Sequence, residues 1–251
     1  MTRRLSLNLF GVNLRFTLGW LAVAVALAGI SVYIIVPPDL SSAEQLSWSV
    51  AVALVVAAVL VLLFTHEAAH IVFARRGREP MTVTEPGLLG ALPDTVYGAE
   101  SPRRELMVAL AGPAASLLCG GLFAVIFFFV PISDSTIRNA VGVAMVAAAG
   151  HAIVSLMPGY PFDGGRITRA FVWHITDDLV VATRFVAFYG YVITMLGLLG
   201  GVLLVSLGDA WAVWGMWLLL LFWTFNGAIR EGSTHVYWHE NSKRLTVDDL
   251  F

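Results

Sequence analysis

Two histidines and one glutamate form the sharpest chemical pattern in the chain. His66, Glu67 and His70 lie within the string HEAAH, which ends a long apolar segment. On a helix, residues four apart share one face, so both imidazoles can bind a single zinc ion. Glu67 follows about 100° further round the helix and can act as a base towards water. The pattern HExxH therefore predicts a metal site that activates water for attack on a carbonyl group.

A zinc site of this kind needs a third protein ligand and keeps its fourth position open. Asp163 is the candidate, in the segment MPGYPFDGGR at 157–166. Prolines on both sides of Gly159 break the helix, and the glycines after Asp163 allow a close backbone approach. On spacing alone, an ordinary Asp-Gly-Gly turn explains this segment about as well.

The composition indicates a membrane protein. Of the 251 residues, 58% are hydrophobic and 13% are charged, whereas a soluble domain has about 25% charged residues. The formal net charge is −2, and no basic patch of the kind that binds nucleic acid is present. We therefore expect no nucleic-acid partner. Three ionisable groups at the end of an apolar helix are costly without a function, which disfavours a merely structural polar cluster at His66 to His70.

Six apolar segments are long enough to cross the bilayer, which requires roughly 20 residues per helix. The sequence therefore predicts an all-α polytopic membrane protein with about six transmembrane helices. The predicted spans are 16–36, 49–74, 105–130, 138–157, 184–206 and 210–229.

Lys and Arg residues predict the orientation of these spans. With six spans, every one of the 15 Lys and Arg residues except Arg138 falls on one side. Because positive loops stay in the cytoplasm, both termini are expected there. Spans two and four then run in the same direction, so that His66, His70 and Asp163 lie at similar depth near the cytoplasmic surface.

The residues after span two differ from a transmembrane helix. Residues 79–101 contain Met81, Thr82, Val83 and Thr84, followed by glycines and prolines. This composition predicts a small β-hairpin or re-entrant segment on the cytoplasmic side. A strand at 81–84 could hold an unwound peptide by edge pairing, so these four residues are candidates for substrate binding.

Three motifs together resemble one known family. HEAAH in one span, AGPAAS at 111–116 in the next, and MPGYPFDGGR after a fourth resemble the site-2 protease family of intramembrane zinc metalloproteases. The resemblance covers roughly residues 50–170. It implies that His66, His70 and Asp163 bind Zn²⁺ and that Glu67 is the general base.

The resemblance also implies a fold and a substrate class. It implies a six-span fold with a small sheet after span two, in the prokaryotic cytoplasmic membrane. The substrates would be membrane-anchored proteins, and the family expectation is an anti-sigma factor or a transcription regulator. The chain departs from the family pattern at Ser116 and Ser155, where the family has Asn. If those Asn residues hold the substrate, the shorter Ser side chains do so more weakly; alternatively, both serines serve helix packing.

Other histidines offer weaker alternatives. His235 and His239 form a second pair four residues apart, but Val236 stands at the base position and the surrounding tail is polar. His151 shares a helix face with Ser155 and either lines the cavity or is a buried, hydrogen-bonded histidine.

We divide the chain into a transmembrane metalloprotease domain, 1–231, and a polar cytoplasmic tail, 232–251. The end of the tail is similar to the start of a CBS module, so the tail is expected to begin such a module. The chain is predicted to be an intramembrane zinc metalloendopeptidase. Two alternatives remain: a catalytically dead or metal-binding membrane protein that binds anchored partners, and a different metalloprotease fold with a tail glutamate as third ligand.

Overall fold

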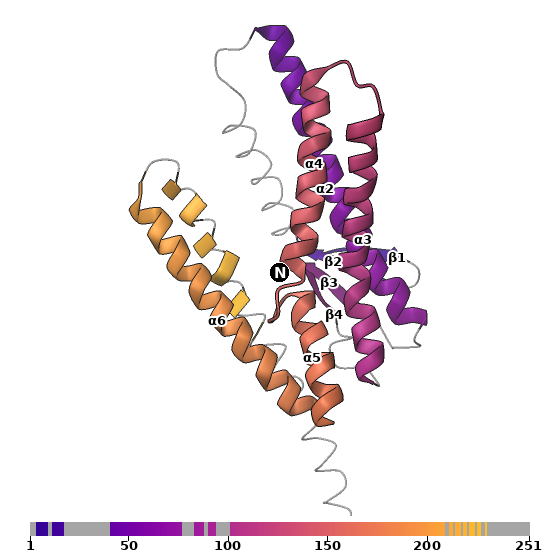
Figure 1. Ribbon diagram of the computed structural model, residues 1–251, viewed down its shortest axis with the longest axis vertical. Coiled ribbons are helices and arrows are strands. Elements are labelled where there is room, and N and C mark those ends of the chain that lie inside the picture. The colour runs from indigo at the N-terminus through magenta and orange to yellow at the C-terminus, as the bar shows by residue number, and fades with distance from the viewer. Residues whose placement is uncertain are drawn as a thin grey trace, which may run out of the picture.

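The computed structural model describes residues 4–9, 12–17, 41–76, 83–87, 90–93 and 101–208, and most positions between 211 and 229. Its elements are β1 Arg4–Leu9, β2 Val12–Thr17, α2 Ser42–Arg76, β3 Val83–Gly87, β4 Gly90–Pro93, α3 Pro102–Phe129, α4 Ser135–Ser155, α5 Asp163–Thr176 and α6 Leu179–Ser206. Helices α2, α3 and α4 pack together as an upright bundle, and α5 packs against both α3 and α6 (Figure 1).

Four of the helices are long and apolar enough to cross a membrane. These segments are Glu44–Ala74, Pro102–Phe129, Ser135–Ser155 and Leu179–Ser206. Large apolar side chains such as Leu118 and Phe129 are 75% and 80% exposed, whereas many polar side chains are buried. This inverted distribution fits a lipid environment and makes the chain an integral membrane protein.

The four helices correspond to the second to fifth predicted spans. Local capping makes them begin three to seven residues earlier than the apolar runs. Ser101 precedes α3 and accepts a hydrogen bond from a first-turn amide, with Pro102 as the first helical residue. Asp134 and Asp178 cap α4 and α6 in the same way. Side chains of this kind satisfy amides that have no partner within the helix.

The other two predicted spans are described in part. Residues 18–40 lie outside the described residues, as does the tail from 230 onwards. Of the predicted sixth span, 210–229, every described position is helical. Phe225 in this segment packs edge to face on Phe162, with ring centroids 5.1 Å apart, which brings the segment next to the start of α5.

The expectation of an all-α fold with one small hairpin is wrong at the N-terminus. Residues 4–9 and 12–17 form antiparallel strands, so the segment predicted as a first span from residue 16 begins within β2. The residue pattern explains this result. Apolar and polar residues alternate in RLSLNL and VNLRFT, and two residues, including Gly11, separate the strands. Alternation with a two-residue connection is typical of a β-hairpin.

The four strands form one sheet with the order β1-β2-β3-β4. Strands β3 and β4 lie within the segment predicted as a hairpin or re-entrant loop and pair antiparallel. Strand β3 also pairs in parallel with β2. With the longest axis of the molecule vertical, the sheet lies at the level of the C-terminal end of α2 and above α5 (Figure 1).

The prediction that the strand at 81–84 has an open edge for a peptide is wrong at Thr84, which the structure describes. Thr84 pairs with Leu14 of β2 on one side and with Pro93 of β4 on the other. The N-terminal hairpin occupies the edge that sequence reasoning left open. Met81 and Thr82 lie outside the described residues.

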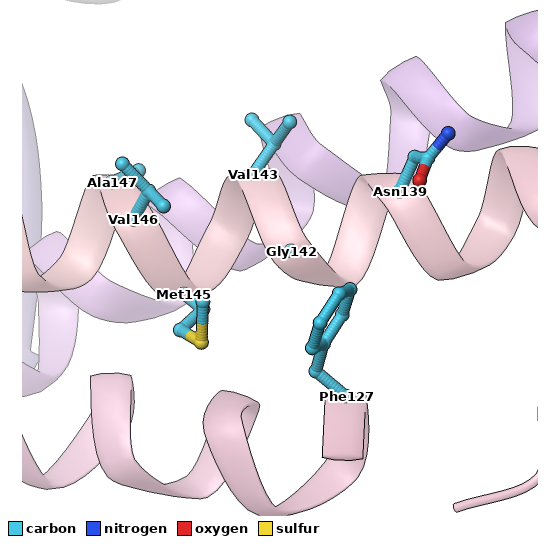
Figure 2. A pocket seen from close by; sticks show the side chains of 7 residues that line it. All are labelled: Phe127, Asn139, Gly142, Val143, Met145, Val146 and Ala147. Atoms are coloured by element: carbon cyan, nitrogen blue, oxygen red, sulfur yellow. The ribbon is translucent and has the colours of Figure 1, made fainter.

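A shallow apolar groove lies between the C-terminal end of α3 and α4. Phe127 of α3 faces Gly142 and Met145 of α4 across it (Figure 2). Phe127 is 15 residues beyond Gly112 on the same helix, which corresponds to roughly 22 Å. The groove is therefore remote from the polar cluster near the start of α3.

A buried ion pair joins α3 to α5. Nε of Arg169 donates a hydrogen bond to Oε1 of Glu105 at 2.7 Å, and Nη2 contacts the same oxygen. Nη1 of Arg169 donates to the hydroxyl of Tyr160, in the loop before α5. Both charged side chains are fully buried. Because Asp163 begins α5, this pair fixes the helix that carries the third ligand candidate.

Removing one partner of this pair should destabilise the protein strongly. We expect Glu105→Gln to lower the free energy of unfolding by about 3–5 kcal/mol, because it leaves the Arg169 charge buried and uncompensated. The double variant Glu105→Gln/Arg169→Met should lose less than the sum of the single changes. Denaturant unfolding in detergent measures both effects, with Glu44→Gln at an exposed position as the control. Additive losses in the double variant would contradict the assigned coupling.

Candidate metal centre

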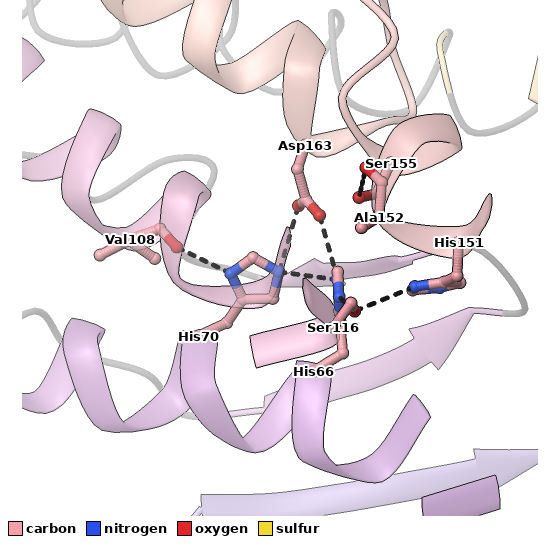
Figure 3. A network of polar contacts seen from close by, with 8 residues as sticks. All are labelled: His66, His70, Val108, Ser116, His151, Ala152, Ser155 and Asp163. Atoms are coloured by element: carbon pink, nitrogen blue, oxygen red, sulfur yellow. Dashed lines mark hydrogen bonds and ion pairs between the residues drawn. The ribbon is translucent and has the colours of Figure 1, made fainter. Parts of the chain in front are cut away.

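Three side chains from two separate helices converge on one point. Nε2 of His66 and Nε2 of His70 lie 3.1 Å apart on α2. The carboxylate of Asp163, the first residue of α5, lies 3.0 Å from the first nitrogen and 3.2 Å from the second. Figure 3 shows the carboxylate above the two imidazoles. In the described part of the chain, these residues form a group able to hold a metal ion.

The geometry of this trio fits zinc. Zinc–ligand bonds of about 2.0–2.1 Å in a tetrahedron place neighbouring ligand atoms about 3.3 Å apart, close to the three distances found here. All three side chains are at most 5% exposed. Oδ2 of Asp163 is buried and makes no hydrogen bond within the described structure. A buried carboxylate whose two oxygens each lie near one of two imidazole nitrogens forms, with those nitrogens, a donor set for a cation.

Helix α3 orients both imidazoles through two residues that are eight positions, about two helical turns, apart. Nδ1 of His70 lies 2.8 Å from the carbonyl oxygen of Val108, and Nδ1 of His66 lies 2.9 Å from Oγ of Ser116. A carbonyl only accepts hydrogen bonds, so Nδ1 of His70 carries the proton. In the neutral ring, Nε2 then offers its lone pair to the metal position. Such bonds to the far nitrogen fix the tautomer and orientation of metal-binding histidines.

Gly112 lies between these two contacts on α3. A Cβ atom at this position would lie 2.3 Å from Nε2 of His70 and 2.6 Å from Nε2 of His66. The rings cannot move away freely, because Val108 and Ser116 on the same helix hold their far nitrogens. The absence of a side chain at Gly112 is therefore required for α3 to pass the ligand atoms.

Close packing also fixes Asp163. The loop after α4 folds over the first turn of α5, where a Cβ at Gly164 would lie 2.1 Å from the carbonyl oxygen of Leu156. Burial by itself would raise the pKa of Asp163, but the adjacent imidazoles of His70 and His66 hold that pKa well below its usual range. The group is therefore a carboxylate, the form that binds metal, and its place at a helix N-terminus favours negative charge.

Two further charged groups lie at this centre. Glu67 is partly exposed and interacts electrostatically with His70. Arg166, one helical turn after Asp163, also interacts electrostatically with His70, and its side chain is buried at 4% exposure. Within the described residues, Nε and Nη2 of Arg166 find no hydrogen-bond acceptor. Sequence reasoning treated Arg166 only as a cytoplasmic positive charge.

The two serines predicted to bind substrate have other contacts. Oγ of Ser116 bridges His66 and Nδ1 of His151, which lies 3.1 Å away. Oγ of Ser155 donates to the carbonyl oxygen of Ala152 in its own helix at 2.9 Å. Both serines are buried. Ser116 thus supports a ligand candidate, and substrate binding by either serine stays a prediction.

Sequence reasoning missed most of the supporting contacts. The Val108 carbonyl has no signature in the sequence, because any residue type supplies it. Gly112 was visible as part of AGPAAS but had no assigned role. Val83 and Thr84 belong to the sheet, whereas His235 and His239 lie outside the described residues.

Comparisons with known proteins agree on the class of site. No family model matches the sequence. The chain is 30% identical over 188 residues to "Putative zinc metalloprotease Rip3" of Mycobacterium tuberculosis, covering 70% of this chain and 45% of that protein. It is 31% identical over 162 residues to "Putative zinc metalloprotease sll0528" of Synechocystis sp., covering 62% of this chain and 42% of that protein. The chain thus spans less than half the length of these relatives.

The fold has a solved counterpart. The site-2 protease from Methanocaldococcus jannaschii matches with a TM-score of 0.63 over 93% of this chain and 95% of that chain, at 20% identity. Both relatives are named zinc metalloproteases. In this chain the trio of His66, His70 and Asp163 could hold a metal ion, and its geometry fits zinc. In sequence the chain is similar to proteins named zinc metalloproteases, and its fold is that of a site-2 protease.

Zinc content tests the ligand trio directly. We expect about one zinc per wild-type chain, as in other three-ligand sites. His66→Ala and Asp163→Ala should each lose it, because two remaining ligands hold zinc weakly. The double variant His235→Ala/His239→Ala should keep it. Metal analysis of the purified chains measures all four. Zinc that is lost only with the tail histidines would place the metal elsewhere.

Gly112 provides a test of the packing against the imidazoles. We expect Gly112→Ala to weaken zinc binding at least 10-fold, because the added methyl group lies where the ligand atoms converge. Gly121→Ala on the same helix is the matched control, since a Cβ there meets nothing within 4 Å. Chelator competition compares the two variants. Equal affinities would show that the close approach at Gly112 is not needed.

Proposed function

We propose that this chain hydrolyses peptide bonds of membrane-anchored proteins near the cytoplasmic leaflet, as a zinc metalloendopeptidase of the bilayer. The observation that carries the proposal is the buried trio of His66, His70 and Asp163, with Glu67 beside it, at the end of a spanning helix. A site built only to bind partners has no need for a carboxylate at the position of Glu67.

Each residue of the site has a separate role in the proposed hydrolysis. Zinc, when bound, supplies a Lewis acid that polarises a carbonyl group and lowers the pKa of water. Glu67 takes a proton from the attacking water and delivers it to the leaving nitrogen as the C–N bond breaks. His66, His70 and Asp163 hold the cation, and α3 keeps the imidazoles in place.

The position of the site along α2 supports a cut near one membrane surface. His70 is six residues before Arg76, where α2 ends, and the apolar segment ends at Ala74. Water can reach this end of the bundle without crossing the hydrocarbon. A carrier would instead place its ligands near the bilayer midplane on broken helices.

A substrate helix must unwind before hydrolysis, because its carbonyls are hydrogen-bonded and shielded. An unwound segment can add as an extra strand to an open sheet edge. Among the described strands, the two edges are β1 and β4, since β2 and β3 are paired on both sides. We therefore move the proposed docking edge from residues 81–84 to one of these two strands.

The orientation and partners follow from the same proposal. The distribution of Lys and Arg favours six spans with both termini in the cytoplasm of a prokaryotic cell. The substrate class is a membrane-anchored protein, with an anchored anti-sigma factor or transcription regulator as the family expectation.

Replacement of the proposed base tests the reaction. We expect Glu67→Gln to lower the rate of cleavage about 10²- to 10⁴-fold, because the amide has the same shape but cannot accept the proton. Zinc content should stay at the wild-type level, since Glu67 is not one of the three ligands. Mass spectrometry of new protein termini in membranes from cells expressing either chain measures cleavage.

Two outcomes of that experiment would contradict the proposal. Equal sets of termini in wild-type and Glu67→Gln membranes would remove Glu67 from the reaction. No new termini within membrane segments in the wild-type sample, despite full zinc loading, would favour a metal-binding membrane protein that binds anchored partners.

A further inference from the structure

His151 of α4 lies beside the metal centre without belonging to its ligand trio. Its Nδ1 is 3.1 Å from Oγ of Ser116, and the same oxygen is 2.9 Å from Nδ1 of His66. The rings of His66 and His151 also meet edge to face, with centroids 4.7 Å apart and planes at 85°. Figure 3 shows Ser116 between the two histidines.

The direction of the protons in this chain of contacts follows from metal binding. A histidine that binds metal through Nε2 carries its proton on Nδ1, so Nδ1 of His66 donates to Oγ of Ser116. The hydroxyl hydrogen of Ser116 is then free to point towards His151. Nδ1 of His151 accepts it, which places the proton of a neutral His151 ring on Nε2.

We propose that His151 is a positioning residue, which acts through Ser116 to fix the ring orientation and tautomer of the zinc ligand His66. The proposal rests on the metal centre described above and concerns ligand support rather than substrate. The contact links three spanning helices, because His66 belongs to α2, Ser116 to α3 and His151 to α4. A serine hydroxyl alone rotates freely, and an acceptor on its far side gives it a single direction.

The helices provide different support to the two imidazoles. His70 bonds a main-chain carbonyl, which cannot rotate. His66 bonds a side-chain hydroxyl, which needs a second partner to define its direction. The loss of the His151 acceptor should therefore disturb His66 and leave the His70 contact intact.

A pair of similar-sized substitutions separates positioning from packing. Leu and Asn have nearly the same shape, but only Asn retains an acceptor near the position of Nδ1. We expect His151→Leu to weaken zinc binding about 10- to 100-fold, the usual range for lost support of a ligand histidine, and His151→Asn to stay within a few-fold of wild type. Chelator competition on the full chain in detergent measures both affinities.

Two further measurements report on the mechanism itself. In Co²⁺-loaded protein, the visible absorption of His151→Leu should shift, because one imidazole ligand changes orientation, whereas that of His151→Asn should match wild type. The variant Ser116→Ala should lose as much affinity as His151→Leu, and the double variant should lose no more than either. His174→Leu, at an exposed position of α5, controls for the loss of a histidine.

Thermal unfolding of the metal-free variants controls for misfolding. Equal zinc affinity in His151→Leu and wild type would overturn the proposal, as would equal losses in the Leu and Asn variants, which would indicate packing alone. If the wild-type chain binds zinc and both variants behave like it, only this inference fails. If wild type binds no zinc, the proposed protease function fails as well.

Discussion

The close contact between α2 and α3 is the constraint on which the site depends. One face of α3 presents a carbonyl at Val108, a bare backbone at Gly112 and a hydroxyl at Ser116, each four residues apart. The carbonyl contacts Nδ1 of His70 and the hydroxyl contacts Nδ1 of His66, on the side of each ring away from the metal position. The glycine leaves room for the two Nε2 ligand atoms. Because the metal position lies where two helices nearly touch, it exists only in the packed bundle.

A second set of buried polar contacts positions the third ligand candidate. In an apolar surrounding, a buried charge is tolerated when it is paired, as in the ion pair of Glu105 and Arg169. That pair and the glycines after Asp163 attach α5 to α3 and to the preceding loop. The carboxylate therefore reaches the imidazoles from a helix that is fixed at two points. The same logic explains why polar side chains gather inside this molecule and apolar ones face outwards.

The sequence was informative wherever function is carried by side-chain type. HEAAH and the aspartate of the Asp-Gly-Gly segment predicted a metal-binding trio, and the structure brings His66, His70 and Asp163 together. Apolar runs predicted the four spanning helices to within a few residues at most ends. The N-terminal hairpin was missed because a long apolar run followed directly and masked the alternation in residues 12–17. The predicted edge strand failed at Thr84 for a related reason, since a distant segment, β2, occupied it.

The sequence by itself determined the ligand types, their spacing on one helix and the membrane environment, because each is encoded by local residue chemistry and period. Only the tertiary structure decided which groups support those ligands. The carbonyl of Val108 has no residue signature, and the contact of Ser116 with His151 joins helices whose mutual rotation is set by packing. Hydrogen bonds between helices depend on distances that no local pattern specifies. For that reason the groups that support the metal ligands could be found only in the folded chain.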